Sequence, residues 1–193
     1  MNLTLIKAFT SQLSPLDETA WGAFEQYLSV QKISKGEDLW STGEVCKHVV
    51  FINKGLIRVY YISLENGEET TVQFLFENRY LTDYYSLITQ QPCQYFYTAL
   101  EQCELISIPR VALYEMYDRF KYFERFGRLM AEQSYLLQQR VLFNLKSISP
   151  EEKYLNLIKE RPKVLQRVPL KLIASYLGMS PEHLSRLRKK ISQ

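Results

Sequence analysis

Between residues 30 and 108 the apolar positions fall in short runs that glycine-containing turns separate. Such runs, rich in β-branched and aromatic residues, predict strands rather than helices. Asn66 and Gly67, between two of these runs, predict the central residues of a type I′ hairpin turn. Many short strands joined by tight turns are typical of a fold that closes its own edges, so we expect an antiparallel β-roll. The clearest predicted strands are 49–52, 56–62, 70–76 and 105–108.

Helical patterns flank this segment on both sides. Before it, Ser14 is predicted as the N-cap of a helix that runs to about Leu28, because a proline follows the serine and Asp17 lies three residues after it. After it, one helix is predicted around residues 111–117 and a second over about 122–145. At 1.5 Å per residue, the second helix would span roughly 35 Å.

One face of this long predicted helix is apolar at helical spacing. Such a face can cover the roll of its own chain, or it can pair with the same helix of a second copy. We expect the second arrangement, because the helix is long for so small a protein. The residues predicted at the dimer interface are Phe123, Phe126, Met130, Leu137 and Val141.

The last 45 residues predict three short helices, which begin after Ser149, at Pro169 and after Ser180. Glu152 completes a capping box at the start of the first helix, and Gly178 ends the second. A helix, a glycine turn and a second helix together predict a helix-turn-helix, whose second helix can enter the DNA major groove.

The third of these helices has an apolar inner face, formed by Leu184, Leu187 and Ile191, and a polar outer face. On the outer face Arg186 can donate two hydrogen bonds to guanine, and Glu182 can accept one from cytosine. Basic groups beside them can hold phosphates. The predicted DNA-binding residues are Ser180, Pro181, Glu182, His183, Ser185, Arg186, Arg188 and Lys189.

The charge is distributed unevenly over the 193 residues. Residues 147–193 carry 10 Lys and Arg against 4 Asp and Glu, whereas residues 1–146 carry 14 against 17. A basic terminal segment favours contact with phosphates, although a solvated helix face gives the same excess. We therefore expect an α+β chain of three parts: a β-roll sensor domain (1–120), a dimerisation helix (121–146) and an all-α helix-turn-helix domain (147–193).

Several classes of protein are disfavoured by the composition. No apolar stretch approaches about 18 residues and the amino end lacks a signal-peptide pattern, so we expect a cytoplasmic protein without a membrane partner. Cys46, Cys93 and Cys103 have no close spacing, and His48 and His183 are the only histidines, which argues against a disulfide framework, a zinc site or an iron–sulfur cluster. With no metal set and no paired nucleophile and base, we expect no enzyme activity.

The order of roll, long helix and helix-turn-helix resembles the cyclic-AMP-receptor and fumarate-nitrate-regulator (Crp/Fnr) family of bacterial transcription factors over nearly the whole chain. The segments KGEDL (35–39), GE (43–44) and FINKGLIR (51–58) are similar to the opening strands of that family. The more specific match is IASYLGMSPEHLSR (173–186), which is similar to its DNA-reading segment.

The resemblance implies a homodimeric regulator that binds double-stranded DNA at specific sequences, with RNA polymerase as a further partner. It also implies that Glu182 and Arg186 contact bases. Pro181 stands where the family often has a basic residue, so the usual target sequence of the family is not expected. An alternative function is an effector-binding or protein-interaction module whose basic tail contacts a protein and which has no specific DNA target.

The sensor segment departs from the cyclic-AMP-binding members of the family. These carry a Gly-Glu-Leu stretch and, about ten residues later, an arginine that neutralises the cyclic phosphate. In this chain residues 82–84 stand in place of the first motif, and Cys93 followed by Gln94 in place of the second. A phosphate buried without a cation is unfavourable, so we expect no cyclic AMP binding in the usual way. Haem binding would need an axial ligand. His48 or a cysteine is only a weak candidate for that ligand, so we do not expect haem.

Aromatic side chains crowd the region where the family binds its effector. They can line a cavity for an apolar or planar ligand with Asp83 as a polar anchor, or they can fill that cavity themselves, and the sequence leaves both open. The candidate pocket residues are Tyr80, Asp83, Tyr84, Tyr85, Cys93, Gln94, Tyr95 and Tyr97.

Overall fold

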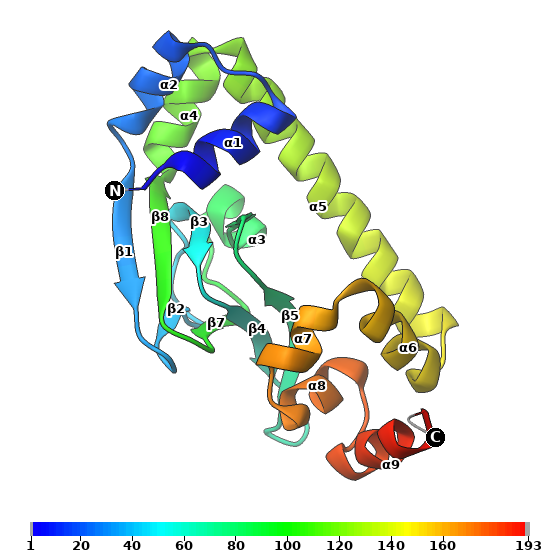
Figure 1. Ribbon diagram of the computed structural model, residues 1–193. Helices are drawn as coiled ribbons and strands as arrows, with labels where there is room; N and C mark the ends of the chain where they lie inside the picture. Colours follow the sequence, from blue (N-terminus) through cyan, green and yellow to red (C-terminus); the bar gives the residue numbers. More distant parts are fainter. Residues whose placement is uncertain (1, 192–193) are drawn as a thin grey trace.

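The computed structural model describes residues 2–191, apart from the side chains of residues 144–146. A β-roll forms one end of the molecule, and a long helix leads from it to a group of short helices beneath the roll (Figure 1). No helix in the described range is long and apolar enough to cross a bilayer.

The roll consists of two antiparallel sheets, with strand orders β1-β8-β3-β6 and β2-β7-β4-β5. All four predicted strands are confirmed, and shorter strands complete both sheets. The strands are β1 (Ser29–Ile33), β2 (Asp38–Trp40), β3 (His48–Lys54), β4 (Ile57–Ile62), β5 (Glu69–Leu75), β6 (Arg79–Leu81), β7 (Phe96–Ala99) and β8 (Cys103–Pro109).

The predicted type I′ turn at Asn66 and Gly67 is wrong. The loop between β4 and β5 spans residues 63–68, and within it Gly67 has a positive φ of 71° whereas Asn66 does not. A type I′ turn needs a positive φ at both central residues. Instead the Asn66 side chain accepts a hydrogen bond from the backbone N–H of Glu68 at 3.0 Å, and Gly67 N–H donates to the Ser63 carbonyl at 2.9 Å. This Asx-type bond stabilises the longer loop.

The amino-terminal segment forms two helices, α1 (Thr4–Leu13) and α2 (Glu18–Glu25), where one was predicted. Ser14 is the C-cap of α1 rather than an N-cap, and its hydroxyl donates to the Tyr122 carbonyl at 2.9 Å. Asp17 is the N-cap of α2, since its carboxylate accepts from the Ala20 N–H at 2.7 Å. The cap was thus assigned three residues too early.

The predicted long helix is confirmed as α5 (Lys121–Ser147), which follows α4 (Arg110–Arg119). Its first turns cover the roll of the same chain. The ring centroids of Phe123 and Phe24 are 4.7 Å apart, and those of Phe126 and Tyr80 are 5.2 Å apart. Phe123 and Phe126 are buried in these contacts, so the prediction that they lie at a dimer interface needs correction: an apolar stripe shows that a helix face is covered, not by which chain.

Four helices follow α5 within residues 148–191: α6 (Pro150–Glu160), α7 (Pro162–Arg167), α8 (Leu170–Leu177) and α9 (Pro181–Ile191). The capping box at Ser149 is present, and Gly178 ends α8 with a φ of 71°. The short helix α7 was not among the predicted elements. Leu56 and Phe74 of the roll belong to the same hydrophobic cluster as the buried residues of α6, α7, α8 and α9. The roll and the terminal helices therefore share a core.

Gly55 joins β3 to β4 in a conformation that a side chain would not tolerate. Its φ is +108°, and a Cβ placed on it would lie 2.9 Å from the Cα of Cys103. We expect Gly55→Ala to lower the free energy of unfolding by about 2 to 4 kcal/mol, through backbone strain and overpacking. Urea unfolding measures this.

Gly22, in α2, is the matched control, because a Cβ there would meet nothing within 4 Å. Gly22→Ala should stabilise the fold by about 0.5 to 1 kcal/mol. Equal stabilities of the two variants would contradict the packing described at Gly55.

Candidate nucleic-acid interface

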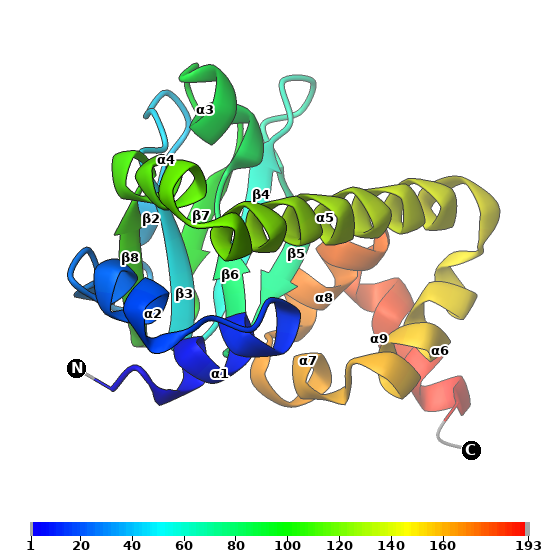
Figure 2. The same cartoon turned by 90° about the horizontal axis from the view of Figure 1, so that it is seen from above.

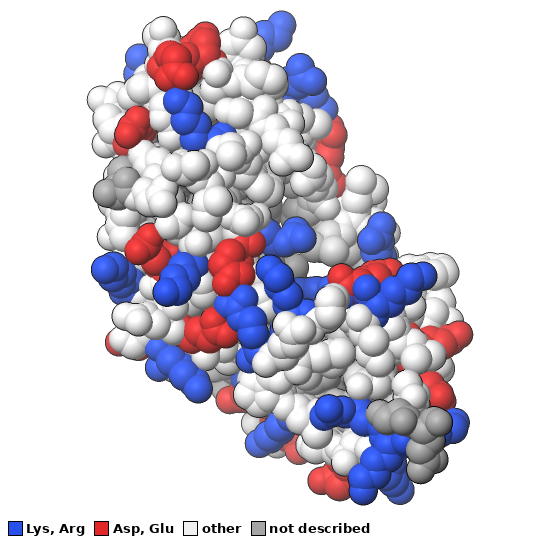
Figure 3. All heavy atoms as spheres, in the orientation of Figure 1, with Lys and Arg blue, Asp and Glu red and all other residues white. Residues whose placement is uncertain are grey.

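Helix α9 packs beside α8 and exposes its polar face to solvent. Leu184 and Leu187 are buried beneath that face, whereas Ile191, predicted to face inward, is 37% exposed. The Ser180 hydroxyl caps α9 by accepting a hydrogen bond from the His183 N–H at 3.2 Å. Lys and Arg gather over α9 at the lower end of the molecule (Figure 3).

The predicted DNA-binding residues occupy this face together. Ser185 is half-buried, and the other seven are exposed: Ser180, Pro181, Glu182, His183, Arg186, Arg188 and Lys189. Hydrogen bonds from its own backbone N–H and from the Ser180 hydroxyl hold the pKa of Glu182 below its usual value, and nearby Arg186 adds to this effect. Glu182 is therefore ionised at neutral pH, as an acceptor for a base amino group must be.

Helix α8 holds α9 against the roll through the backbone of an edge strand. Strand β5 lies at the edge of its sheet, and α8 lies beside it (Figure 2). The Ser175 hydroxyl accepts from the Thr71 N–H at 2.9 Å and donates to the Glu69 carbonyl at 3.0 Å. One side chain of α8 thus satisfies the outward backbone groups that an edge strand otherwise leaves unpaired.

A second attachment is ionic and involves α7. Arg167 donates to Glu101 at 2.9 and 2.6 Å and to Glu77 at 3.0 Å. The hydrogen bond from Arg167 lowers the pKa of Glu77. Arg161, which precedes α7, donates to the Phe74 carbonyl of β5. A band of mixed charge crosses the middle of the molecule, where the roll meets the terminal helices (Figure 3). We call the contacts of Ser175, Arg167 and Arg161 with the roll the latch.

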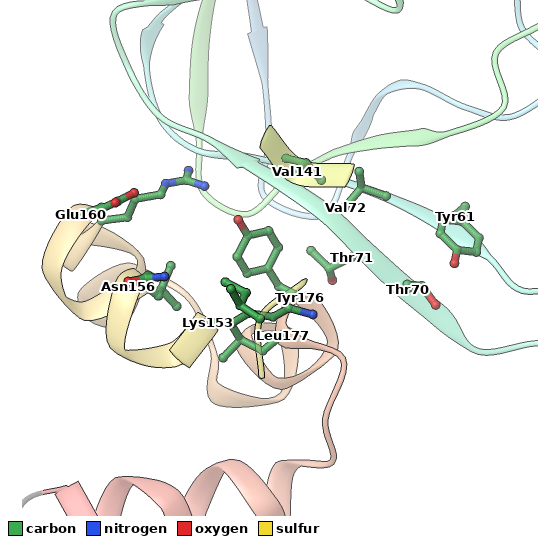
Figure 4. A pocket seen from close by; sticks show the side chains of 13 residues that line it. Tyr61, Thr70, Thr71, Val72, Val141, Lys153, Asn156, Glu160, Tyr176 and Leu177 are labelled. Carbon is green, nitrogen blue, oxygen red and sulfur yellow. The ribbon is translucent and has the colours of Figure 1, made fainter. Parts of the chain in front are cut away.

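Beside the latch, the roll and the terminal helices leave a cavity of about 230 Å³. Tyr61 and Thr70 line it from the β4–β5 side, Lys153 and Asn156 from α6, and Tyr176 from α8 (Figure 4). A gap therefore remains between the two parts at this cavity, although Tyr154 and Leu157 of α6 belong to the core that they share.

The predicted effector-pocket residues do not line one cavity. Inside the roll, Tyr97 donates to Asp83 at 3.0 Å, and its ring lies 5.2 Å from that of Trp40. Cys93 is buried there as well, and burial raises its pKa to about 11. These side chains fill the roll rather than lining a space within it.

The other five predicted pocket residues lie elsewhere. Tyr85 and Gln94 are exposed, and the Tyr95 ring contacts that of Tyr61. Tyr80 and Tyr84 line a cavity toward α4 and α5. Of the two alternatives that the sequence left open, these positions favour aromatic side chains that fill the roll, because the aromatic residues in this segment point to different sides of it.

The Ser175 bridge is testable by amide hydrogen exchange. In Ser175→Ala the Thr71 N–H loses its acceptor, and a net loss of about 1 kcal/mol corresponds to exchange about fivefold faster. The amide of Val59, in the next strand β4, serves as the internal reference, and Ser185→Ala on α9 is the matched control. Unchanged exchange at Thr71 would show that α8 is not bonded to β5 in solution.

Comparison with known proteins identifies the roll. Residues 30–120 match the family model described as cyclic nucleotide-binding domain. A search of curated protein sequences found no match.

Solved structures resemble the chain over most of its length. FixK2 from Bradyrhizobium japonicum aligns with a TM-score of 0.75 at 14% identity, over 86% of this chain and 84% of that one. A protein described as a transcriptional regulator of the Crp/Fnr family from Eubacterium rectale aligns with a TM-score of 0.72 at 15% identity, over 92% and 84%. The c-di-GMP-responsive global regulator CLP from Xanthomonas campestris gives 0.66 at 16%, over 91% and 92%. Residues 30–120 thus match the cyclic nucleotide-binding domain family, and over 86–92% of its length the chain has the fold of these three solved structures.

Proposed function

We propose that this chain is a homodimeric transcriptional regulator that binds specific DNA sequences through a helix-turn-helix formed by α8 and α9. The observation that carries the proposal is the exposed face of α9, where Glu182, Arg186 and Lys189 lie together above a buried apolar side. The related folds of two proteins described as regulators support it. RNA polymerase is the protein that such a regulator would contact.

In the proposed complex α9 lies in the major groove. Arg186 has the donors to read guanine, Glu182 has the acceptor for cytosine, and Lys189 is placed to hold a phosphate. The latch supports this role, because a reading helix needs a fixed position relative to the rest of the dimer. In a two-fold dimer the two copies would meet half-sites about 34 to 36 Å apart, so the target would be a near-palindrome.

We propose that a neighbouring face of α5 forms the dimer interface, because two of the three remaining predicted residues are partly buried. Met130 and Val141 are partly buried and line cavities of their own chain, and Leu137 is 43% exposed. Another set of apolar residues recurs at a spacing of seven: Tyr122, Leu129, Leu136 and Phe143. Leu136 and Phe143 are each 65% exposed, and seven-residue spacing is the repeat of paired helices.

Cyclic AMP is not the effector in this proposal. Cys93 stands where a cation would neutralise the cyclic phosphate, and it is 1% exposed. The Asp83 carboxylate lies in the same buried cluster and accepts from Tyr97, so an anion entering there would meet negative charge and no partner.

The assignment of the reading face predicts two distinct DNA-binding defects. Arg186→Ala should cost about 1 to 3 kcal/mol per half-site on a selected target and relax the preference at one base pair. Lys189→Ala should weaken binding to every sequence alike and reduce the salt dependence by about one ion per half-site. Titrations with a selected site and with random DNA, at two salt concentrations, measure both effects.

Circular dichroism confirms that both variants are folded. Equal losses on the two DNAs for Arg186→Ala would mean that this side chain touches only phosphate. Binding of wild-type protein to neither DNA would favour the alternative function, an interaction module without a DNA target.

The dimer interface predicts that a charge at Leu136 separates the subunits. Leu136→Glu buries a carboxylate in an apolar seam, which costs several kcal/mol. Light scattering at low micromolar concentration should therefore report monomers. Gln138→Glu, about 160° around α5 at 3.6 residues per turn, is the control and should stay dimeric. A dimeric Leu136→Glu variant would place the interface elsewhere.

A further inference from the structure

A cavity of about 330 Å³ lies outside the roll, between its β3–β8 face and the helices α3 (Tyr84–Thr89), α4 and α5. Figure 2 shows α3 and α4 on the side of the roll where α5 begins. Val49 and Ile108 of the roll, Leu87 of α3 and Leu113 of α4 give it apolar walls. Its volume lies within the range of cavities that hold small organic ligands.

Two tyrosine side chains supply the polar groups of this cavity. Tyr84 and Tyr117 line it, and neither hydroxyl has a hydrogen-bond partner among the residues described. By contrast the Tyr80 hydroxyl, which also borders the cavity, is paired with the Thr10 hydroxyl at 2.7 Å. Among the described residues only Asn53 Oδ1 is fully buried without a partner, so the Tyr84 and Tyr117 hydroxyls are open to the cavity and free to bond an occupant. Burial raises the pKa of both, which keeps them protonated as donors.

Gly127 in α5 makes room for one of these hydroxyls. A Cβ at this position would lie 2.5 Å from the Tyr117 hydroxyl oxygen. Glycine in the interior of an exposed helix costs about 1 kcal/mol relative to alanine, so its presence within α5 needs a structural reason. Close approach of the Tyr117 hydroxyl to the α5 backbone provides that reason and fixes the donor at the cavity wall.

The charges near the cavity lie at its rim. Glu124 and Arg128 are exposed, and Arg128 is paired with Glu132 at 2.5 Å. Arg128 is the only cation among the described lining residues and is already paired, so a buried anionic group would find no free partner. The occupant that fits is therefore uncharged, largely apolar, and equipped with an oxygen that accepts from tyrosine hydroxyls.

We propose that this cavity is a binding site for an uncharged, largely apolar molecule carrying a carbonyl or similar acceptor oxygen, which Tyr84 and Tyr117 bind. The site differs from the interior of the roll, where Tyr97, Asp83 and Cys93 fill the space. None of the proposed seam residues Leu129, Leu136 and Phe143 is among the residues that line it. Through α5 an occupant would brace the helix that leads to the DNA-binding helices. Only this regulatory consequence rests on the proposed function.

The test uses prodan, a neutral naphthyl ketone whose fluorescence shifts to the blue in apolar surroundings. We expect saturable binding of one molecule per chain in the full-length protein without DNA. Tyr117→Phe should weaken binding about three- to tenfold, as expected for one lost hydrogen bond. Tyr135→Phe, at an exposed tyrosine of the same helix, should leave it unchanged.

A second pair of variants tests the location. Met130→Trp and Ala131→Trp place an indole at the cavity wall and should weaken prodan binding more than tenfold. Gln138→Trp, exposed on the same helix and not among the lining residues, should not. The proposal is overturned if prodan does not bind saturably, or if it binds the Met130 and Ala131 variants as tightly as the wild type.

The DNA titrations distinguish this failure from that of the proposed function. If Ala131→Trp loses prodan binding while its affinity for DNA is unchanged, the substitution has removed ligand binding at the cavity without affecting DNA binding. Saturable prodan binding to a protein that binds no DNA would support the cavity and contradict the regulator.

Discussion

The position of the terminal helices relative to the roll depends on the hydrogen bonds that the outward backbone groups of the edge strand β5 make. Strand β5 lies at the edge of its sheet. Its outward Thr71 N–H and Glu69 carbonyl would lack hydrogen-bond partners if nothing covered them. Ser175 of α8 bonds to both, while Phe74 from the same strand enters the core of the terminal helices. Hydrogen bonding and apolar burial therefore act on the same contact. They fix α8 to the roll, and α9 with it, because Leu184 and Leu187 tie α9 into that core.

This attachment gives the roll a direct mechanical connection to α9. Arg167 adds ion pairs to Glu77 and Glu101, two residues that lie in different loops of the roll. Each of these side chains is between 24% and 34% exposed, so solvent screens the pairs only partly. A second connection runs through α5, which borders the cavity between α3 and α4 and ends beside α6. A change in the roll or in that cavity can therefore reach α9 by two routes.

Local chemical signals made the turn before α9 and the cap of that helix predictable. Gly178, Ser180 and Pro181 specify a turn and a cap within four residues, and the structure places them as expected. Contacts between distant residues were not predictable. Arg167 and Glu77 are 90 positions apart, and nothing in either local sequence pairs them.

Periodicity identified the apolar face of α5 correctly but not its partner, because Phe123 and Phe126 would look the same against a roll or a second chain. For the same reason the run of tyrosines after residue 79 could not reveal that Tyr97 points into the roll and Tyr84 away from it.

If the latch works as described, it holds α9 in one position relative to the roll. The most direct test is a spin-label distance between Leu64→Cys, in the fully exposed β4–β5 loop, and Lys190→Cys on α9, in protein diluted with unlabelled chains. The native cysteines are at most 1% exposed and should not react. A single narrow distance distribution that broadens when Arg167→Gln is introduced is the predicted result. A broad distribution in the otherwise unaltered chain would contradict the account.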